Sequence, residues 1–278
     1  MRLFFVLALL AVFQGHDAFA AGSKDIALPR RDGKETPVRL YGDWNRCLPT
    51  MILSHGMGGD YSGLAYVANA AAANSFRAAV MGHAESGRSA LRSVLFTRKS
   101  RKEDALLNPA IWQGRFDDIE ATLAFATTNC RPPLLVLAGH SMGAATTMLE
   151  AGTRGAVAYG GADRFDAYVA LSPQGVSWMF KDTSAWSNIK KPVLLITGTE
   201  DSMFNDDYQN RVKTFDYLPR GYKRIVIIDG ADHMDFGGRG KNSEAQQTTT
   251  RAIFDYLSML QQKSIQTVSY PNALVKDK

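Results

Sequence analysis

Short apolar runs alternate with longer helix-like stretches along most of this chain of 278 residues, and this alternation limits the fold more than any other feature. The apolar runs are residues 50–54, 77–81, 134–138, 167–171, 193–197 and 224–228. The stretches typical of helices are residues 61–74, 111–128, 142–151, 206–217 and 248–262. Strands that alternate with helices of this length predict βαβ units and a mostly parallel sheet. Because several runs are apolar throughout, we expect helices on both faces of the sheet.

Two extended segments, residues 24–28 and 36–41, precede the alternating region, and the connection between them contains Asp32-Gly33. An Asp-Gly pair at this place is a hairpin signal. An antiparallel pair that leads into six parallel strands is the strand order of the α/β-hydrolase fold. We therefore expect one α/β domain over residues 21–278, with a mostly parallel eight-stranded sheet and a loosely attached tail from about residue 263.

The motif Gly139-His140-Ser141-Met142-Gly143 lies between an expected strand and an expected helix. In this context a G-x-S-x-G motif forms a nucleophile elbow, a strained turn that exposes the serine hydroxyl above the sheet. The alternative is a phosphate-binding loop, but such a loop requires a lysine that does not follow here. Ser141 is therefore predicted to be a nucleophile.

A second glycine-rich motif, His55-Gly56-Met57-Gly58-Gly59, directly follows the first of the expected parallel strands. Acyl transfer needs two donors aimed at the oxygen that becomes negative. In this fold one donor is the amide after the nucleophile, and the other comes from the loop after the third strand. We therefore expect the amides of Met57 and Met142 to form an oxyanion hole. A tight turn without a catalytic part is the alternative.

The general base follows by elimination among the histidines. His55 and His140 belong to the two motifs. His83 precedes Ser141, whereas this fold presents serine, then acid, then histidine along the chain. His233 follows the last expected parallel strand, so we predict that it takes the proton from Ser141.

The acid is expected between Ser141 and His233, at the end of a strand. The strand at residues 193–197 runs into Gly198-Thr199-Glu200-Asp201. Asp201 is favoured because its short carboxylate points back toward the imidazole, where it would orient the ring and stabilise the imidazolium. Glu200 is the alternative acid.

Together, these motifs resemble those of exported bacterial α/β hydrolases, in particular the dienelactone hydrolase-like and platelet-activating-factor acetylhydrolase-like groups. Arg115-Phe116-Asp117-Asp118-Ile119, ahead of the nucleophile strand, is also similar to those groups. The sequence departs from both. True dienelactone hydrolases have a cysteine in place of Ser141, so their substrate is not implied. The acetylhydrolases place the acid after the next strand, where this chain has Leu171-Ser172-Pro173 and no carboxylate.

These residues predict a serine carboxylic-ester hydrolase of the esterase or lipase type, which acts on a small-molecule ester through an acyl-enzyme. No cofactor or metal is implied. A peptidase or amidase on the same fold is one alternative, and a non-catalytic binding protein that retains the fold is another. The formal net charge of +5 is modest and does not indicate nucleic acid. The sequence specifies neither the acyl chain nor the oligomeric state.

The first 20 residues have the pattern of a cleavable secretory signal: Arg2, an apolar run over residues 3–13, and Ala18-Phe19-Ala20. A membrane anchor is the alternative, but a span takes about 20 apolar residues. We expect cleavage after Ala20 and export to the periplasm or the medium, with no membrane span in the mature chain.

The two cysteines of the chain, Cys47 and Cys130, are expected to form a disulfide, since paired cysteines are usual in exported proteins. Each lies just before a strand, and in this fold the two strands are neighbours. The bond is therefore expected at the edge of the sheet opposite the active site.

Residues 85–108 show no periodicity and carry six cationic side chains against three acidic ones. The segment follows a strand that is expected to end on the same rim as Ser141, where its cations would attract anionic esters. A solvated surface loop is the alternative. The cationic residues are Arg88, Arg92, Arg98, Lys99, Arg101 and Lys102.

Overall fold

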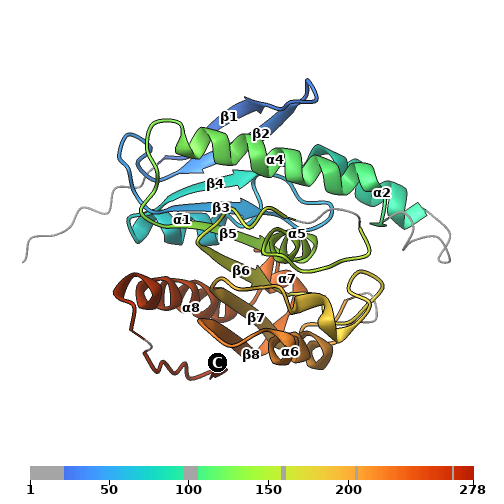
Figure 1. Ribbon diagram of the computed structural model, residues 1–278, viewed down its shortest axis with the longest axis vertical. Coiled ribbons are helices and arrows are strands. Elements are labelled where there is room, and N and C mark those ends of the chain that lie inside the picture. Colours follow the sequence, from blue (N-terminus) through green and yellow to red (C-terminus); the bar gives the residue numbers. More distant parts are fainter. Residues whose placement is uncertain (1–21, 97–105, 158–160, 204–205, 265) are drawn as a thin grey trace, which may run out of the picture.

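The computed structural model describes residues 22–96, 106–157, 161–203, 206–264 and 266–278 (Figure 1). The expected signal at residues 1–20 lies outside the described residues, as does the part of the basic segment that contains Arg98, Lys99, Arg101 and Lys102. Within the described ranges, no helix has the length and apolar character needed to cross a bilayer.

A nine-stranded sheet forms the centre of the molecule, in the order β1-β2-β4-β3-β5-β6-β7-β8-β9. Strands β3 to β8 run parallel, whereas β1, β2 and β9 are antiparallel to their neighbours. The mostly parallel sheet expected from the alternating pattern is confirmed. The strands are β1 (Lys24–Pro29), β2 (Glu35–Tyr41), β3 (Thr50–Ser54), β4 (Arg77–Met81), β5 (Leu135–His140), β6 (Ala167–Leu171), β7 (Val193–Glu200), β8 (Lys223–Asp232) and β9 (Ala273–Asp277).

Helices pack against both faces of this sheet (Figure 1). The strand residues alternate between the two apolar cores: on β3, Met51 and Leu53 face one core and Ile52 faces the other. Buried residues of α1 and α8 belong to the first core, and those of α4, α5 and α6 belong to the second. The helices are α1 (Ala65–Ala73), α2 (Arg88–Phe96), α4 (Pro109–Thr127), α5 (Met142–Glu150), α6 (Tyr208–Tyr217), α7 (His233–Phe236) and α8 (Ser243–Gln262), with 3-10 turns η1 (Ala84–Ser86) and η3 (Thr183–Trp186).

The C-terminal segment differs from the loose tail that the sequence suggested. Strand β9 pairs with β8 along its whole length and adds a ninth strand to the eight expected. Asp277 accepts a hydrogen bond of 2.7 Å from Nε of Arg224, whose side chain is buried. The expectation was wrong for these residues because a short edge strand gains its stability from pairing with β8, which its own composition does not reveal.

The segment after β4 also contains more regular structure than its sequence indicated. It forms η1 and then α2, which brings Leu91 to the wall of the cavity beside Ser141. Of its described cations, Arg88 lies 3.4 Å from Asp60 and is mostly exposed. Among the described residues of α2, the side chain that lines this cavity is the apolar Leu91.

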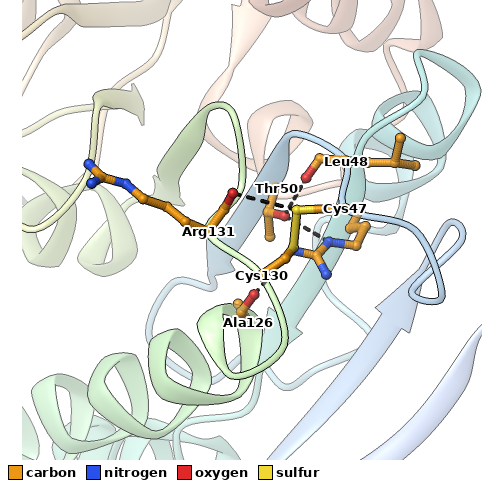
Figure 2. Close-up of a disulfide and its surroundings, with 7 residues drawn as sticks. Cys47, Leu48, Thr50, Ala126, Cys130 and Arg131 are labelled. Carbon is orange, nitrogen blue, oxygen red and sulfur yellow. Dashed lines mark hydrogen bonds between the residues drawn. A yellow bond between two sulfur atoms is a disulfide. The ribbon is translucent and has the colours of Figure 1, made fainter.

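The disulfide between Cys47 and Cys130 lies at the edge of the sheet where β3 and β5 begin (Figure 2). The Cα atoms of the two cysteines are 6.0 Å apart. Strands β3 and β5 are hydrogen-bonded neighbours, and Ser141 follows the opposite end of β5. The bond expected from the strand order is thus present in the structure, remote from the candidate site.

Replacing both cysteines with serine is expected to lower the free energy of unfolding by roughly 2–4 kcal/mol, because the bond closes a loop with a sequence separation of 83. The turnover number should stay unchanged, since the bond lies at the far end of β5. Urea unfolding and ester hydrolysis, compared between the Cys47→Ser/Cys130→Ser variant and the parent chain, measure the two effects. Two free thiols in protein recovered from an oxidising compartment would contradict the pairing.

Candidate active site

Ser141 occupies the sharp turn between β5 and α5, with φ at 55° and ψ at −117°. A residue with a side chain adopts this positive φ only when the surrounding structure enforces it. The enforcement here is close packing around the turn: a Cβ on Gly143 would overlap the carbonyl of Ser54, and a Cβ on Gly139 would overlap the backbone of Gly143. This geometry agrees with the strained elbow expected from the motif.

His233 and Asp201 approach Ser141 from the ends of two neighbouring strands, β8 and β7. Nε2 of His233 lies 2.9 Å from Oγ of Ser141, and Nδ1 lies 2.9 Å from Oδ1 of Asp201. An ionised carboxylate only accepts, so Nδ1 carries the proton of the neutral ring and Nε2 is free to accept from Ser141. The structure thus brings together the three side chains that the sequence selected as nucleophile, base and acid.

The start of α7 positions His233. The preceding residue, Asp232, caps this helix by accepting from the amides of Met234 and Asp235. The carboxylate of Asp235 accepts a hydrogen bond of 2.9 Å from the amide of Asp232, which completes a capping box. Asp232 therefore fixes the backbone next to His233.

Asp201 is completely buried, whereas Glu200, the alternative acid, is exposed. Besides His233, the Asp201 carboxylate accepts from Oγ1 of Thr197 at 2.8 Å and from Oγ of Ser172, and it lies 3.2 Å from Nε of Arg211. Burial raises the pKa of Asp201, but the hydrogen bond from His233 and the charge of Arg211 outweigh this effect and bring the pKa below its usual value. Asp201 is thus stabilised as an anion.

Sequence reasoning missed Ser172 and Arg211, which bind the carboxylate of Asp201. Ser172 directly follows β6 with φ at 53°, at the place where the acetylhydrolases have their acid. Arg211 on α6 is buried and also donates to the carbonyl oxygens of Asp201, Ser172 and Pro173. The Ser-Pro pair after a buried strand is a weak signal, and nothing local distinguishes Arg211 from a solvent-facing helical arginine.

His140, the middle residue of the elbow motif, is a further residue whose contact the sequence did not indicate. Its Nε2 donates to the carbonyl oxygen of His233 at 2.8 Å. Burial, followed by the nearby His233, lowers the pKa of His140 to about 3, so its ring stays neutral. His140 therefore helps to fix the backbone of the candidate base.

Two backbone amides beside Ser141 are free to bind an oxyanion. Met142 is the first residue of α5, so its N–H has no acceptor within the helix, and Ser141 does not cap it. The N–H of Met57 finds no hydrogen-bond acceptor among the residues that the structure describes. Met57 and Ser141 line the same cavity, and a Cβ built on Gly56 would lie 3.2 Å from Cβ of Ser141. The structure therefore places Met57 and Met142, the two residues selected from the sequence, close to Ser141.

Two hollows meet at Ser141 and His233. The first has a volume of about 180 Å³ and mainly apolar walls, from Met57, Leu64, Leu91, Met203 and Met234. The second, of about 230 Å³, is more polar and is lined by Gln174, Val176, Trp178, Asp206 and Asn210. Of the aromatic side chains near this second wall, Trp178 faces the hollow, whereas Phe180 and Trp186 are buried in the core. Within the described ranges, no group of three or more His, Cys, Asp or Glu residues is arranged to hold a metal ion.

Comparisons with known proteins identify the architecture. No protein-family model matches the chain, and no curated protein has a significant sequence match to it. Among solved structures, it resembles a dienelactone hydrolase from Anabaena variabilis with a TM-score of 0.61 and 16% identity, over 86% of this chain and 97% of that one.

Two further solved structures share the architecture. An esterase of Pyrococcus furiosus aligns with a TM-score of 0.59 and 13% identity, over 86% of this chain and 92% of that one. An alpha-beta serine hydrolase homologue from Coxiella burnetii aligns with a TM-score of 0.58 and 17% identity, over 82% and 96%. The chain has the α/β-hydrolase fold, and its structural neighbours include the dienelactone hydrolases and esterases that the motifs suggested.

Proposed function

We propose that this chain is a serine hydrolase that cleaves carboxylic esters of small molecules. The observation that carries the proposal is the hydrogen-bonded series from Ser141 through His233 to Asp201, 2.9 Å at each step, where two hollows meet. Two free amides beside the serine add the donors that acyl transfer needs. The names of the structural neighbours, a dienelactone hydrolase and an esterase among them, favour an ester as the substrate.

In the proposed reaction, Oγ of Ser141 attacks the acyl carbon while its proton passes to Nε2 of His233. The amides of Met57 and Met142 stabilise the oxygen that becomes negative. His233 then gives the proton to the leaving alcohol, and the acyl group remains on Ser141. Water, deprotonated by His233, then attacks the acyl carbon. The bond from this carbon to Oγ of Ser141 breaks, Oγ takes the proton back from Nε2 of His233, and the carboxylic acid is released. Asp201 keeps Nδ1 of the ring protonated and stabilises the imidazolium.

A fluorophosphonate probe tests whether the chain is a serine hydrolase at all. The probe should label Ser141, because it mimics the acyl group that an activated serine attacks. A folded protein that resists labelling would be a binding protein that retains the fold. Comparing p-nitrophenyl esters with the matching anilides then separates an esterase from an amidase, and faster anilide cleavage would reject the ester proposal.

We also propose that the mature chain is exported, to the periplasm or the medium, after cleavage behind Ala20. The pattern of residues 1–20 and the disulfide support this, since such bonds persist in oxidising compartments. N-terminal sequencing of the protein recovered outside the cytoplasm should begin at Ala21. A chain that keeps Met1 and stays with the membrane fraction would support the anchor instead.

A further inference from the structure

A second Ser–His–Asp arrangement lies beneath the turn that carries Met57. Oγ of Ser54 is 2.9 Å from Nε2 of His83, and Nδ1 of His83 is 2.8 Å from Oδ2 of Asp118. All three residues are buried, with at most 2% of their surface exposed, so a substrate does not reach Ser54. Burying three polar side chains costs free energy unless each is hydrogen-bonded. None of the three takes part directly in the proposed reaction.

Arg115 connects this arrangement to the backbone of the turn. Its guanidinium is fully buried in α4 and donates to the carbonyl oxygen of His55, to Oγ of Ser54 at 3.0 Å and to Oγ of Ser86 at 2.5 Å. Ser86 in turn accepts the backbone N–H of Gly58 at 2.8 Å through its carbonyl oxygen. Arg115 thus contacts the start of the turn directly, at His55. It contacts the end of the turn indirectly, through Ser86, which binds Gly58.

The protons of this arrangement have a defined direction. An arginine only donates, so Ser54 accepts from Arg115. When Asp118 is ionised it only accepts, so Nδ1 of His83 carries the ring proton and Nε2 accepts from the hydroxyl of Ser54. Burial lowers the pKa of His83 well below its usual value, which keeps the ring in this neutral form. The series runs from the buried cation of Arg115 to Asp118. Burial raises the pKa of Asp118 to about 7, and Arg30 donates directly to this carboxyl group at 3.2 Å.

The ring of His55 fixes the next peptide. Its Nε2 accepts the backbone N–H of His83 at 3.0 Å, so Nδ1 carries the proton and donates to the carbonyl oxygen of Gly56 at 2.6 Å. The N–H of Gly59 reaches the same oxygen at 3.1 Å. Two donors therefore hold the carbonyl of Gly56 on one side of the turn.

The orientation of this carbonyl decides where the amide of Met57 points. In a planar trans peptide the N–H lies opposite the C=O, so holding the Gly56 oxygen directs the Met57 N–H the other way. Gly56, Met57 and Ser141 line the same cavity. Gly56 and Gly58 flank Met57, and Gly58 has φ at 75°. Glycines make such a turn flexible, so its orientation depends on the buried hydrogen bonds.

We propose that Arg115 is a positioning residue for the reaction: with Ser54, His83 and Asp118 it keeps the Met57 amide turned toward the oxyanion. The proposal rests on the proposed ester hydrolysis. It also gives a role to Arg115 and Asp118, two residues of the segment 115–119 whose sequence resembles the dienelactone hydrolase-like and acetylhydrolase-like groups.

Arg115→Met is expected to lower kcat for p-nitrophenyl butyrate about 10²-fold with KM changed less than about threefold, since loss of one oxyanion donor costs about 10²–10³ in kcat. A trifluoromethyl ketone forms an oxyanion adduct with the serine, so its affinity should fall by a similar factor. A matched control is Arg224→Met, which removes another buried arginine, at the start of β8 and bonded to Asp277. This control should keep kcat and ketone affinity at a temperature where it is folded.

If Arg115→Met fails to fold, the Ser54→Ala variant tests the proposal instead. It removes the hydroxyl that links Arg115 to His83, with little change in side-chain volume. Its kcat and its affinity for the ketone should each fall about tenfold, because the net contribution of one hydrogen bond corresponds to about this factor. KM should stay unchanged. A folded variant of this pair with parental kcat and ketone affinity overturns the proposal while the esterase assignment stands. A parent chain that neither cleaves esters nor reacts with a fluorophosphonate overturns both.

Discussion

Replacing Ser141 with alanine is expected to lower kcat for p-nitrophenyl butyrate by about 10⁵–10⁶-fold, since removal of a serine nucleophile costs about this much in serine hydrolases. The amides of Met57 and Met142 would remain, so the variant should still bind the ester with a similar KM. The oxyanion donors and binding alone leave only about 10³–10⁴ over the reaction in water. Steady-state hydrolysis, together with loss of the initial burst of p-nitrophenol, measures the effect.

Ser258→Ala on α8 is the matched control for the loss of a hydroxyl, and it should retain the parental rate. Thermal unfolding of both variants shows whether the fold is intact. Alanine keeps the Cβ that the positive φ at residue 141 already accommodates, so the elbow should not change. More than about 1% of the parental kcat in a folded Ser141→Ala variant would be far above the activity expected after loss of the nucleophile. Such a result would mean that another group is the nucleophile.

The sequence predicted those parts of the fold that are determined by residues close together in the chain. The elbow at Ser141 needs glycines within two residues on either side, and these stand next to it in the chain. Strands such as β5 are buried on both faces, so residues 135–139 are all apolar or small and the strand is evident without its partners. Strand β9 had no such signal, because three of its five residues are exposed and its place depends on β8.

The residues that the sequence did not reveal act between different elements of the fold. Arg211 contacts Asp201 from another element, and Ser172 contacts it across 29 residues. His83 could be rejected as the base from chain order, and the structure places it away from Ser141. Its partners, Ser54 and Asp118, are 29 and 35 residues distant, and no local spacing marks them as a group. Such contacts become visible only when the sheet brings the ends of β3 and β4 together.

Asp201→Asn is expected to lower kcat by about 10⁴-fold, the loss seen when a triad acid becomes an amide. The structure supplies a reason beyond ring orientation. Arg211 is a buried cation 3.2 Å from Asp201, and the carboxylate offsets its charge. Without the carboxylate, Arg211 would oppose the second positive charge that forms on His233 during the reaction. Measuring kcat across the neutral pH range, where the parent carboxylate is ionised, isolates this loss from titration of Asp201.

Glu200→Gln is the matched control, since it makes the same chemical change one residue earlier. Glu200 is exposed, and the structure assigns the hydrogen bond to Nδ1 of His233 to Asp201. An exposed charge interacts weakly through water, so kcat should stay within about threefold of the parent. A greater loss for Glu200→Gln than for Asp201→Asn would move the acid to Glu200, and the hydrogen bonds that Thr197 and Ser172 donate to Asp201 would then serve stability alone.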